Sequence, residues 1–418
     1  MVDGFGMKGG EADMPFSDRS VQSEREEFCR LAGEASANVR ELCRRFGISP
    51  TTGYKWLAIY VEAGEAGLVD RSRRPLSSPT RTTAELEAKV LQVRAEHRAW
   101  GGRKIRRVLE NNGVASVPAA STITEILRRH GKLDGPGAGE RRDFMRFEHA
   151  APNDLWQMDF KGWIGLPAGR CHPLTVLDDH SRYALELEAC TDETAETVKA
   201  RLTAVFRRYG LPWRLLADNG PPWGTAGQGQ YTRLGVWLMD LGIGLVHGRP
   251  YHPQTQGKEE RFHRTLKAEV LDSNELKTID EAQAAFDAWR SVYNTKRPHE
   301  ALGLDTPASR YTVSSRSMPE TIVPPQYETP DHVRKVDQNG RFSFKGRILN
   351  TSTAFAGKAL ALRATNTDGL FELCYRSHRI AQIDLRSNTP QPVHHVPEHP
   401  STMCTVCTVP CVEGGGTQ

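Results

Sequence analysis

Strand-like and helix-like segments alternate between residues 151 and 270, and this alternation constrains the fold more than any other feature of the chain. Strands are predicted at 155–164, 173–178, 182–189, 213–217 and 243–246, and helices at 193–209, at 229–241 and from about 257 onward. Val198, Leu202 and Phe206 repeat at helical spacing within the first of these helices. Consecutive strands followed by strand–helix alternation predict a mixed sheet covered by helices.

Three acidic residues stand at the ends or edges of these predicted elements. Asp159 lies near the end of the first strand, Asp218 directly follows the 213–217 strand, and Glu260 lies near the start of the last helix. Hard divalent cations prefer oxygen ligands, and two of them can hold the attacking and the leaving oxygen of a phosphodiester. We therefore expect folding to gather Asp159, Asp218 and Glu260 into one cation site.

Each acid taken singly has a plainer interpretation. Asp159 would suit the end of a strand, and Asp218 would suit an ordinary turn with Asn219 and Gly220. Glu260 would be favoured by the helix macrodipole near a helix N-terminus.

The N-terminal part predicts DNA-binding helices. A short amphipathic helix at 39–46 is followed by a turn, in which Ser49 is the expected N-cap and Pro50 the first helical residue. This is the helix-turn-helix pattern, whose second helix enters the major groove. The expected base-reading residues are Thr51, Thr52, Tyr54 and Lys55. The alternative is a plain helical hairpin.

A second helix-turn-helix is predicted within 80–133. Its middle helix is basic and carries the expected DNA contacts Arg103, Lys104 and Arg106, and Ser121 is the expected cap of its last helix. Arg73 and Arg74, in the linker between the two modules, are expected to contact phosphates. Residues 14–150 hold 24 Lys and Arg against 18 Asp and Glu, an excess of 24 − 18 = +6 in a chain whose net charge is +4. The charge therefore favours a polyanionic partner for this region.

The C-terminal part changes in character. Short strand-like runs between 325 and 386 predict a small SH3-like β-barrel, whereas 387–418 is expected to be disordered. Cys404, Cys407 and Cys411 have a spacing that could also bind zinc. The other five cysteines are scattered singly, which favours reduced, packed thiols.

No apolar run reaches the roughly 18–20 residues that span a bilayer. We therefore expect a cytoplasmic protein associated with the nucleoid. Residues 1–22 are Gly-rich and acidic and are expected to be disordered, and translation could begin at Met1 or at Met14.

Two longer motifs carry a family resemblance. Residues 218–223 read Asp-Asn-Gly-Pro-Pro-Trp, and residues 251–263 read Tyr-His-Pro-Gln-Thr-Gln-Gly-Lys-Glu-Glu-Arg-Phe-His. With Trp-Gln-Met-Asp-Phe at 156–160, they resemble the DDE transposases of bacterial insertion sequences, which share a ribonuclease H-like core with retroviral integrases. The resemblance covers about 36–310 and implies a catalytic core at 151–312, joined by a linker at 134–150 to the helical modules.

The resemblance also implies an activity and its residues. The implied enzyme is a DDE-type polynucleotidyl transferase that binds terminal inverted repeats, cuts the DNA strand and transfers it, with two Mg²⁺ (Mn²⁺ as a substitute) held by Asp159, Asp218 and Glu260. His252, Gln254 and Lys258 would contact DNA. Because an element has two ends, a homo-oligomer of at least two chains is implied, with double-stranded DNA and no small molecule as substrate.

Helical phase offers an alternative to Glu260, although we follow the family motif. Periodicity places Glu259 nearer than Glu260 to the apolar stripe of Phe262, Leu266 and Val270, since successive residues differ by about 100°. The family motif instead places the ligand immediately before Arg-Phe, which is Glu260. Two other functions are also open: a catalytically inactive DNA-binding regulator, and a nonspecific nuclease of the same fold.

Overall fold

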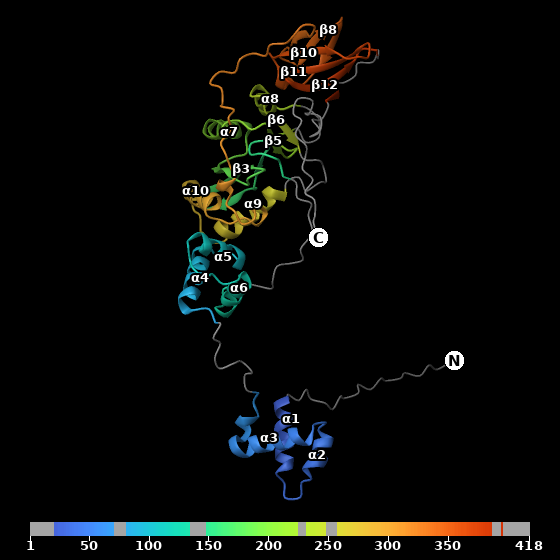
Figure 1. Ribbon diagram of the computed structural model, residues 1–418. Coiled ribbons are helices and arrows are strands. Elements are labelled where there is room, and N and C mark those ends of the chain that lie inside the picture. Colours follow the sequence, from blue (N-terminus) through green and yellow to red (C-terminus); the bar gives the residue numbers. More distant parts are fainter. Residues whose placement is uncertain are drawn as a thin grey trace, which may run out of the picture. The chain divides into compact units, whose positions relative to one another are not determined.

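The computed structural model describes residues 21–70, 81–133, 148–224, 231–247 and 257–386, and the backbone of 394–395 (Figure 1). The chain divides into two compact units, Met1–Arg81 and Thr82–Gln418. No helix of the described residues is both long enough and apolar enough to cross a membrane. The disorder expected over 1–22 and 387–418 mostly concerns residues whose structure is not described, as do the predicted zinc ligands Cys404, Cys407 and Cys411. That expectation is wrong at residues 21–22, which open the first helix, and at 394–395, which form a short strand.

The first unit is a three-helix domain. It consists of α1 (Val21–Ala32), α2 (Val39–Arg45), α3 (Pro50–Ala63) and a 3-10 turn, η1 (Gly64–Leu68). Ser49 is the N-cap of α3, because its hydroxyl accepts a hydrogen bond from the backbone N–H of Thr52 at 3.1 Å, and Pro50 opens the helix. The predicted cap and helix start are thus confirmed.

The second unit begins with another three-helix domain, made of α4 (Ala84–Glu96), α5 (Gly102–Asn111) and α6 (Ala120–Arg129). Its core includes Trp100, Ile105 and Ile123. The expectation that Ser121 caps the last helix is wrong, because α6 already begins at Ala120. Ala119 occupies the N-cap position and offers no side-chain hydrogen bond.

A mixed sheet forms the centre of the second unit. Its elements in chain order are β1 (Trp156–Phe160), β2 (Ile164–Leu166), β3 (Gly169–Asp178), β4 (Ala184–Cys190), α7 (Ala195–Tyr209), β5 (Arg214–Ala217), α8 (Arg233–Asp240), β6 (Gly244–His247), α9 (Gly257–Leu266), the π-turn η3 (Lys267–Leu271) and α10 (Ile279–Thr295). The strand order is β2-β3-β1-β5-β6, with β4 also paired to β3. β3 is antiparallel to β1, β2 and β4, whereas β1, β5 and β6 are parallel.

Helices cover both faces of this sheet (Figure 1). One apolar cluster joins the strands to α7 and α8 through residues such as Phe206 and Trp237, and the other joins them to α9 and α10 through Phe262 and Phe286. The expected mixed sheet with helical cover is confirmed. The single strand expected at 155–164 is instead two strands, because the chain turns between them at Gly162, whose φ is +85°.

Short 3-10 turns follow α10 at η4 (Glu300–Leu302) and η5 (Pro307–Ser309). The C-terminal region contains β7 (His332–Lys335), β8 (Arg341–Phe344), β9 (Arg347–Asn350), the 3-10 turn η6 (Thr353–Phe355), β10 (Ala359–Ala364), β11 (Leu370–Tyr375), β12 (His378–Asp384) and β13 (His394–His395). Their pairing gives an antiparallel five-stranded sheet, β13-β12-β11-β10-β7, and a separate β8–β9 hairpin. The predicted closed barrel is not confirmed, because both sheets are open over the described residues.

The C-terminal sheets share one core with the central sheet's helix α8. Val236 and Met239 of α8 belong to the same apolar cluster as Phe344, Phe355 and Tyr375. The five cysteines expected to be packed thiols, Cys29, Cys43, Cys171, Cys190 and Cys374, are all buried and free.

The close packing in the first unit gives a stability prediction. A Cβ atom at Gly53 would lie 2.9 Å from the ring of Phe28 and closer still to Sγ of Cys43. Gly53→Ala should therefore lower the free energy of unfolding of this domain by about 1–3 kcal/mol, as overpacking does. Urea denaturation followed by circular dichroism measures the change. Gly33→Ala is the control, since its Cβ would meet only ordinary contacts at 3.5 Å; equal stability of the two variants would contradict the packing argument.

Candidate functional site

The parallel pairing of β1 and β5 brings two of the predicted acids together. Trp156 lies opposite Leu215 and Gln157 opposite Leu216. Continuing this register by two residues places Asp218 opposite Asp159. Neighbouring strands are about 4.8 Å apart and aligned residues point to the same face, so the two carboxylates are neighbours at one edge of the sheet.

The two carboxylates have unusual electrostatics. Burial, and then the charge of Asp218, raise the pKa of Asp159 to about 7. Burial also raises the pKa of Asp218. The backbone N–H of Gly220 donates a hydrogen bond to the Asp218 carboxylate at 3.2 Å, which lowers this pKa and offsets part of the effect of burial. The charge of Glu193 adds to both upward shifts. This edge of the sheet therefore has a surplus of negative charge, which a cation would relieve.

Neighbouring residues hold the two aspartates in place. Phe160, directly after Asp159, stacks on Trp223 with ring centroids 5.7 Å apart, and Trp223 belongs to the loop that follows Asp218. The imidazole Nδ1 of His247 lies 2.7 Å from the backbone carbonyl oxygen of Asp218. Residues of two strands, β1 and β6, and of one loop thus hold both strand ends. Sequence reasoning missed this stack, although Trp223 stands in the motif that signalled Asp218.

The third predicted acid is placed differently. Glu260 is exposed in the first turn of α9. Glu259 is the acid that points inward, with 1% of its surface exposed and its carboxylate accepting a hydrogen bond from Oγ1 of Thr175 at 3.1 Å. Over the described residues no group of three or more His, Cys, Asp or Glu is arranged to hold a metal ion. The expected trio is therefore not gathered here, and Glu260 as its third member stays a prediction.

Helical phase accounts for this placement. Glu259 shares the buried face of α9 with Phe262 and Leu266, as the periodicity of the sequence indicated. Glu260 is about 100° further around the axis. The segment that leads into α9, residues 248–256, lies outside the described part of the chain.

A buried polar network lies beneath Asp159. The hydroxyl of Thr175 is 3.0 Å from the carbonyl oxygen of Asp159 and 2.9 Å from Nε2 of His263. Nδ1 of His263 is 4.0 Å from Oδ2 of Asp159. Burial lowers the pKa of His263 to about 4, and burial raises the pKa of Glu259 well above its ordinary value. Only Glu259 could have been found from the sequence, through its helical phase.

The donor chemistry of this site fits a divalent cation. Asp159 and Asp218 offer adjacent carboxylates, which are the hard oxygen donors that Mg²⁺ and Mn²⁺ prefer. In addition, Oε1 of Glu259 is buried and has no hydrogen-bond partner among the described residues.

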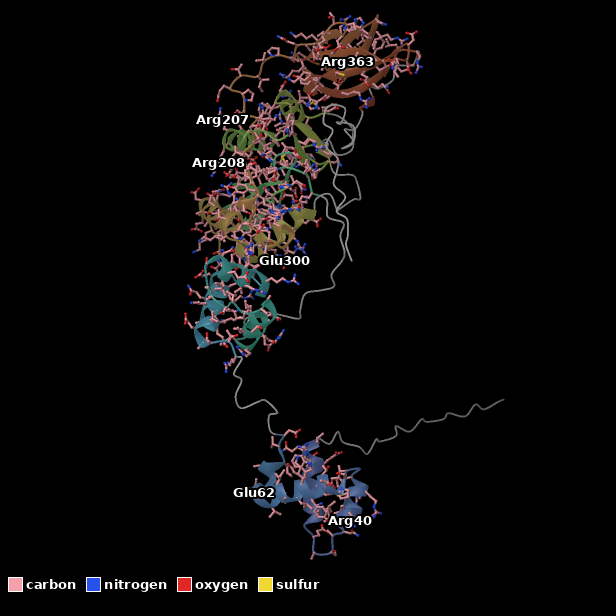
Figure 2. The ribbon with its side chains drawn as sticks, viewed as in Figure 1. Arg40, Glu62, Arg207, Arg208, Glu300 and Arg363 are labelled. Carbon is pink, nitrogen blue, oxygen red and sulfur yellow. The ribbon has the colours of Figure 1, made fainter. Side chains whose placement is uncertain are left out.

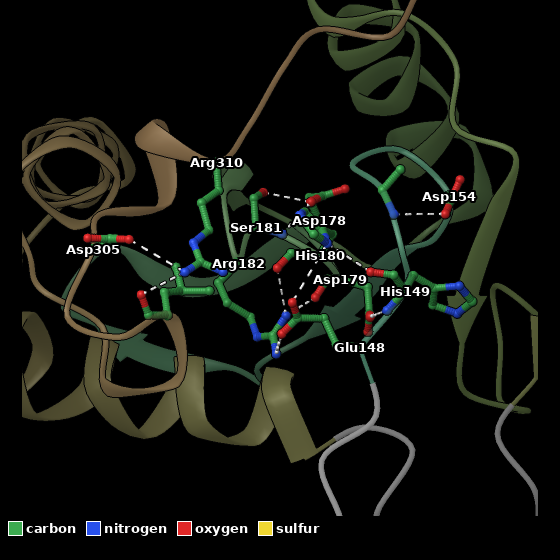
Figure 3. Close-up of polar contacts among 12 residues, drawn as sticks. Glu148, His149, Asp154, Asp178, Asp179, His180, Ser181, Arg182, Asp305 and Arg310 are labelled. Atoms are coloured by element: carbon green, nitrogen blue, oxygen red, sulfur yellow. Dashed lines mark hydrogen bonds and ion pairs between the residues drawn. The ribbon is translucent and has the colours of Figure 1, made fainter. Parts of the chain in front are cut away.

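Lys258, a predicted DNA contact, is engaged inside the protein. Its ammonium group forms an ion pair with Asp179, whose side chain is 4% exposed. Asp179 also accepts hydrogen bonds from the backbone N–H of His149 at 2.9 Å and from Gln157 at 2.7 Å. Figure 3 shows Asp179 among the polar contacts of the loop at 178–182. In the same loop, Arg182 donates a hydrogen bond to the carboxylate of Glu148 at 3.0 Å. The Lys258–Asp179 pair thus ties the first turn of α9 to the sheet.

The predicted reading residues of α3 are placed unequally. Thr51, Tyr54 and Lys55 are exposed. Thr52 is half-buried, and its hydroxyl lies 2.9 Å from that of Ser49, so it takes part in the cap. Arg73, Arg74, His252 and Gln254 lie outside the described residues, and their DNA contacts stay predictions.

The basic helix α5 faces the segment after α10. Arg103 lies 3.8 Å from Glu300, which Figure 2 labels, and Arg107 lies 3.0 Å from Asp305. Arg106 pairs with Glu110 on its own helix at 2.8 Å. Burial, and then the charge of Arg297, lower the pKa of Lys104 to about 8. These four cations therefore have partners or neighbours within the second unit, and the DNA contacts of Arg103, Lys104 and Arg106 stay predictions.

Models of several protein families match parts of the chain. Two models described as integrase core domain match residues 149–253 and 241–307, the C-terminal domain of the IS481 family transposase matches 331–391, and two homeodomain-like models match 25–69 and 52–127.

Two of the curated relatives come from insertion elements. The 39.2 kDa protein of IS476 from Xanthomonas euvesicatoria is 28% identical over 250 residues, which are 58% of this chain and 69% of that protein. The 31.7 kDa protein of IS407 from Burkholderia multivorans is 25% identical over 249 residues, 58% of this chain and 87% of that protein. Among solved structures, the catalytic core of BIV integrase is 30% identical, with a TM-score of 0.30, and covers 38% of this chain and 92% of its own.

The raised pKa of Asp159 gives a prediction for the metal-free protein. The folded state keeps a proton on Asp159 up to about pH 7, whereas an unfolded chain releases it near its ordinary pKa of about 3.9. Stability should therefore fall as pH rises from about 4 to about 7, by on the order of 1–3 kcal/mol. Asp159→Asn should flatten the dependence of stability on pH, and this variant should be more stable than the wild-type protein at pH 8. Urea denaturation in EDTA at several pH values measures it; identical pH profiles for both proteins would contradict the electrostatic account.

Proposed function

Since this chain combines an integrase core domain with the C-terminal domain of an insertion-element transposase family, we propose that it is a DDE-type polynucleotidyl transferase, a transposase. It binds the terminal inverted repeats of its element, cuts a DNA strand there and joins the cut end to target DNA. The observation that carries this proposal is the parallel register that sets Asp159 beside Asp218.

Asp159, Asp218 and Glu260 are the proposed ligands of two Mg²⁺, with Mn²⁺ as a substitute. When bound, such ions activate water and offset the charge that develops on phosphate oxygens. Asp159 and Asp218 supply the negative charge that attracts these ions, and the residues around them keep both carboxylates at the same sheet edge.

The reaction has two similar steps. Water attacks the phosphodiester at the element end, which breaks the bond to the 3′ oxygen and leaves a 3′ hydroxyl. That hydroxyl then attacks a phosphodiester of the target and releases a new 3′ hydroxyl there. Both steps exchange one phosphodiester oxygen for another, so the protein need not supply a nucleophile.

DNA recognition is assigned first to α3. Thr51, Tyr54 and Lys55 are exposed on this helix, as residues that meet base edges must be. Two element ends require two such surfaces, so the active form is a homo-oligomer of at least two chains, acting on DNA of the nucleoid.

A second candidate function is a DNA-binding regulator without catalytic activity. The observation that favours it is the absence, over the described residues, of a group of three acids or histidines arranged for a metal. DNA cutting in the presence of Mg²⁺ or Mn²⁺ distinguishes the two functions, because the regulator would bind element ends and leave them intact.

The proposed catalytic acids give the first functional prediction. Asp159→Asn, Asp218→Asn and Glu260→Gln should each reduce strand cutting by roughly a hundredfold or more, as loss of one charge-stabilising group does. Binding to the element end should stay within about twofold, because the helical domains supply recognition. Labelled duplexes that carry the flanking inverted repeats measure cutting on denaturing gels and binding on native gels. Cutting at the wild-type rate by any of the three variants would refute that residue's assignment.

A separate prediction concerns the register of α9. Glu259→Gln keeps an acceptor for the hydroxyl of Thr175 and should cut DNA within a few fold of the wild-type rate, whereas Glu260→Gln should not cut. The same gel assay, run side by side on both variants, measures this. The opposite pattern, with Glu260→Gln active and Glu259→Gln inactive, would assign the third ligand to Glu259.

A further inference from the structure

Two tryptophan side chains of the described residues are largely exposed, Trp163 at 60% and Trp213 at 56%. Each carries an arginine over its ring: Arg170 lies 4.6 Å from the ring centre of Trp163, and Arg316 lies 4.2 Å from that of Trp213. Their positions in the sheet differ. Trp163 follows the carboxyl end of β1, where Asp159 lies, whereas Trp213 precedes the amino end of β5.

The β2–β3 hairpin turns Trp163 away from the protein core. Cys171 belongs to the apolar cluster beneath α9 and α10. Ile164 lies opposite Cys171 and packs against the same cluster. Side chains alternate along a strand, so Trp163, its second neighbour Gly165 and the residue opposite Gly165, Arg170, face the other way. All three are exposed.

Gly165 leaves the indole accessible. A Cβ atom there would lie 3.8 Å from Cζ3 of Trp163, so any larger side chain at this position would stand against the ring. With glycine, an accessible ring remains, supported by the guanidinium of Arg170. Exposed aromatic rings with adjacent cations bind nucleobases by stacking, and arginine in addition binds phosphate.

The hairpin is close to the proposed site of cutting. In β3, Thr175 lies opposite Asp159 and Cys171 lies opposite Ile164. These two positions are four residues apart, which is about 13 Å along a strand. That distance equals about four base steps of DNA at a rise of about 3.4 Å per step.

The path between the two points is basic. Lys161 lies between Asp159 and Trp163 in the chain. Lys267 of η3 is close enough to Lys161 for the two ammonium charges to interact. Burial, and then the charge of Lys267, lower the pKa of Lys161. With Arg170, these cations offer a track for the phosphates of a DNA strand that reaches Asp159.

We propose that Trp163 and Arg170 form a nucleobase platform that holds an unpaired base about four nucleotides from the phosphodiester to be cut. The indole stacks on the base and Arg170 contacts the adjoining phosphate. The base must leave the duplex, because a paired base already has neighbours on both faces. This proposal rests on the proposed function and adds the positioning of the substrate strand to it.

The test uses the full-length protein and a fluorescent base. 2-Aminopurine is placed at successive positions around the cut site of an element-end duplex, and its emission is measured in the uncut complex with Asp159→Asn protein. Stacking on an indole quenches 2-aminopurine, so one or two positions about four nucleotides from the cut should be quenched. Adding Trp163→Ala should remove that quenching, and adding Trp163→Phe should retain part of it.

Trp213→Ala is the matched control, since it removes an equally exposed, arginine-backed indole from the other end of the sheet. It should leave the quenching and the rate of cutting within about twofold of the parent protein. In the otherwise wild-type protein, Trp163→Ala should slow cutting roughly tenfold, in line with the loss of one stacked base. Melting temperatures check that each variant is folded.

The outcomes separate the platform from the catalytic proposal. Equal emission with and without Trp163 at every position, or the same loss on Trp213→Ala, overturns the platform while wild-type cutting still supports the transposase. Quenching that depends on Trp163 in a protein that never cuts DNA supports the platform and overturns the catalytic function.

Discussion

The parallel contact between β1 and β5 is the constraint on which the site depends. It aligns residues 59 positions apart in the chain, and so it turns two distant strand ends into one acidic edge. Like charges at this spacing repel: after burial, the charge of Asp218 is the next cause that raises the pKa of Asp159. The backbone pairing of β1 with β5, the apolar clusters on both sheet faces and the Phe160–Trp223 stack oppose this repulsion.

The buried polar network beneath Asp159, formed by Thr175, Glu259 and His263, would by itself lower the stability of the fold. A buried carboxyl with one unpartnered oxygen, at Glu259, costs free energy that an apolar side chain of similar size would not. Thr175 has a single hydroxyl proton, yet its oxygen lies within 3.1 Å of three polar atoms, so its partners cannot all be satisfied by donation from it. Residues that lower stability in this way concentrate at functional sites, where a bound ion or substrate restores the balance.

The sequence predicted the elements better than the contacts between them. Strand–helix alternation predicts the mixed sheet, and Ser49 predicts the start of α3, because both signals are local. Ser121 failed as a cap because α6 begins one residue earlier, at Ala120, which leaves the N-cap position to Ala119. The ion pair of Lys258 with Asp179 joins residues 79 positions apart, and no local pattern announces it. The sequence likewise does not predict that Trp163 is exposed, since tryptophan side chains are more often buried.

The first turn of α9 shows how these constraints combine. A lysine in the first turn opposes the helix macrodipole, so Lys258 is unfavourable there unless a carboxylate compensates it. Asp179 provides that compensation from the sheet, and its own position is set by Gln157 and by the backbone of His149. With Lys258 directed to the 178–182 loop, the rotation of α9 about its axis is fixed: Glu259 points to Thr175, and Glu260 lies about 100° beyond it. The proposed approach of Glu260 to Asp159 therefore requires this ion pair to loosen or the start of the helix to shift.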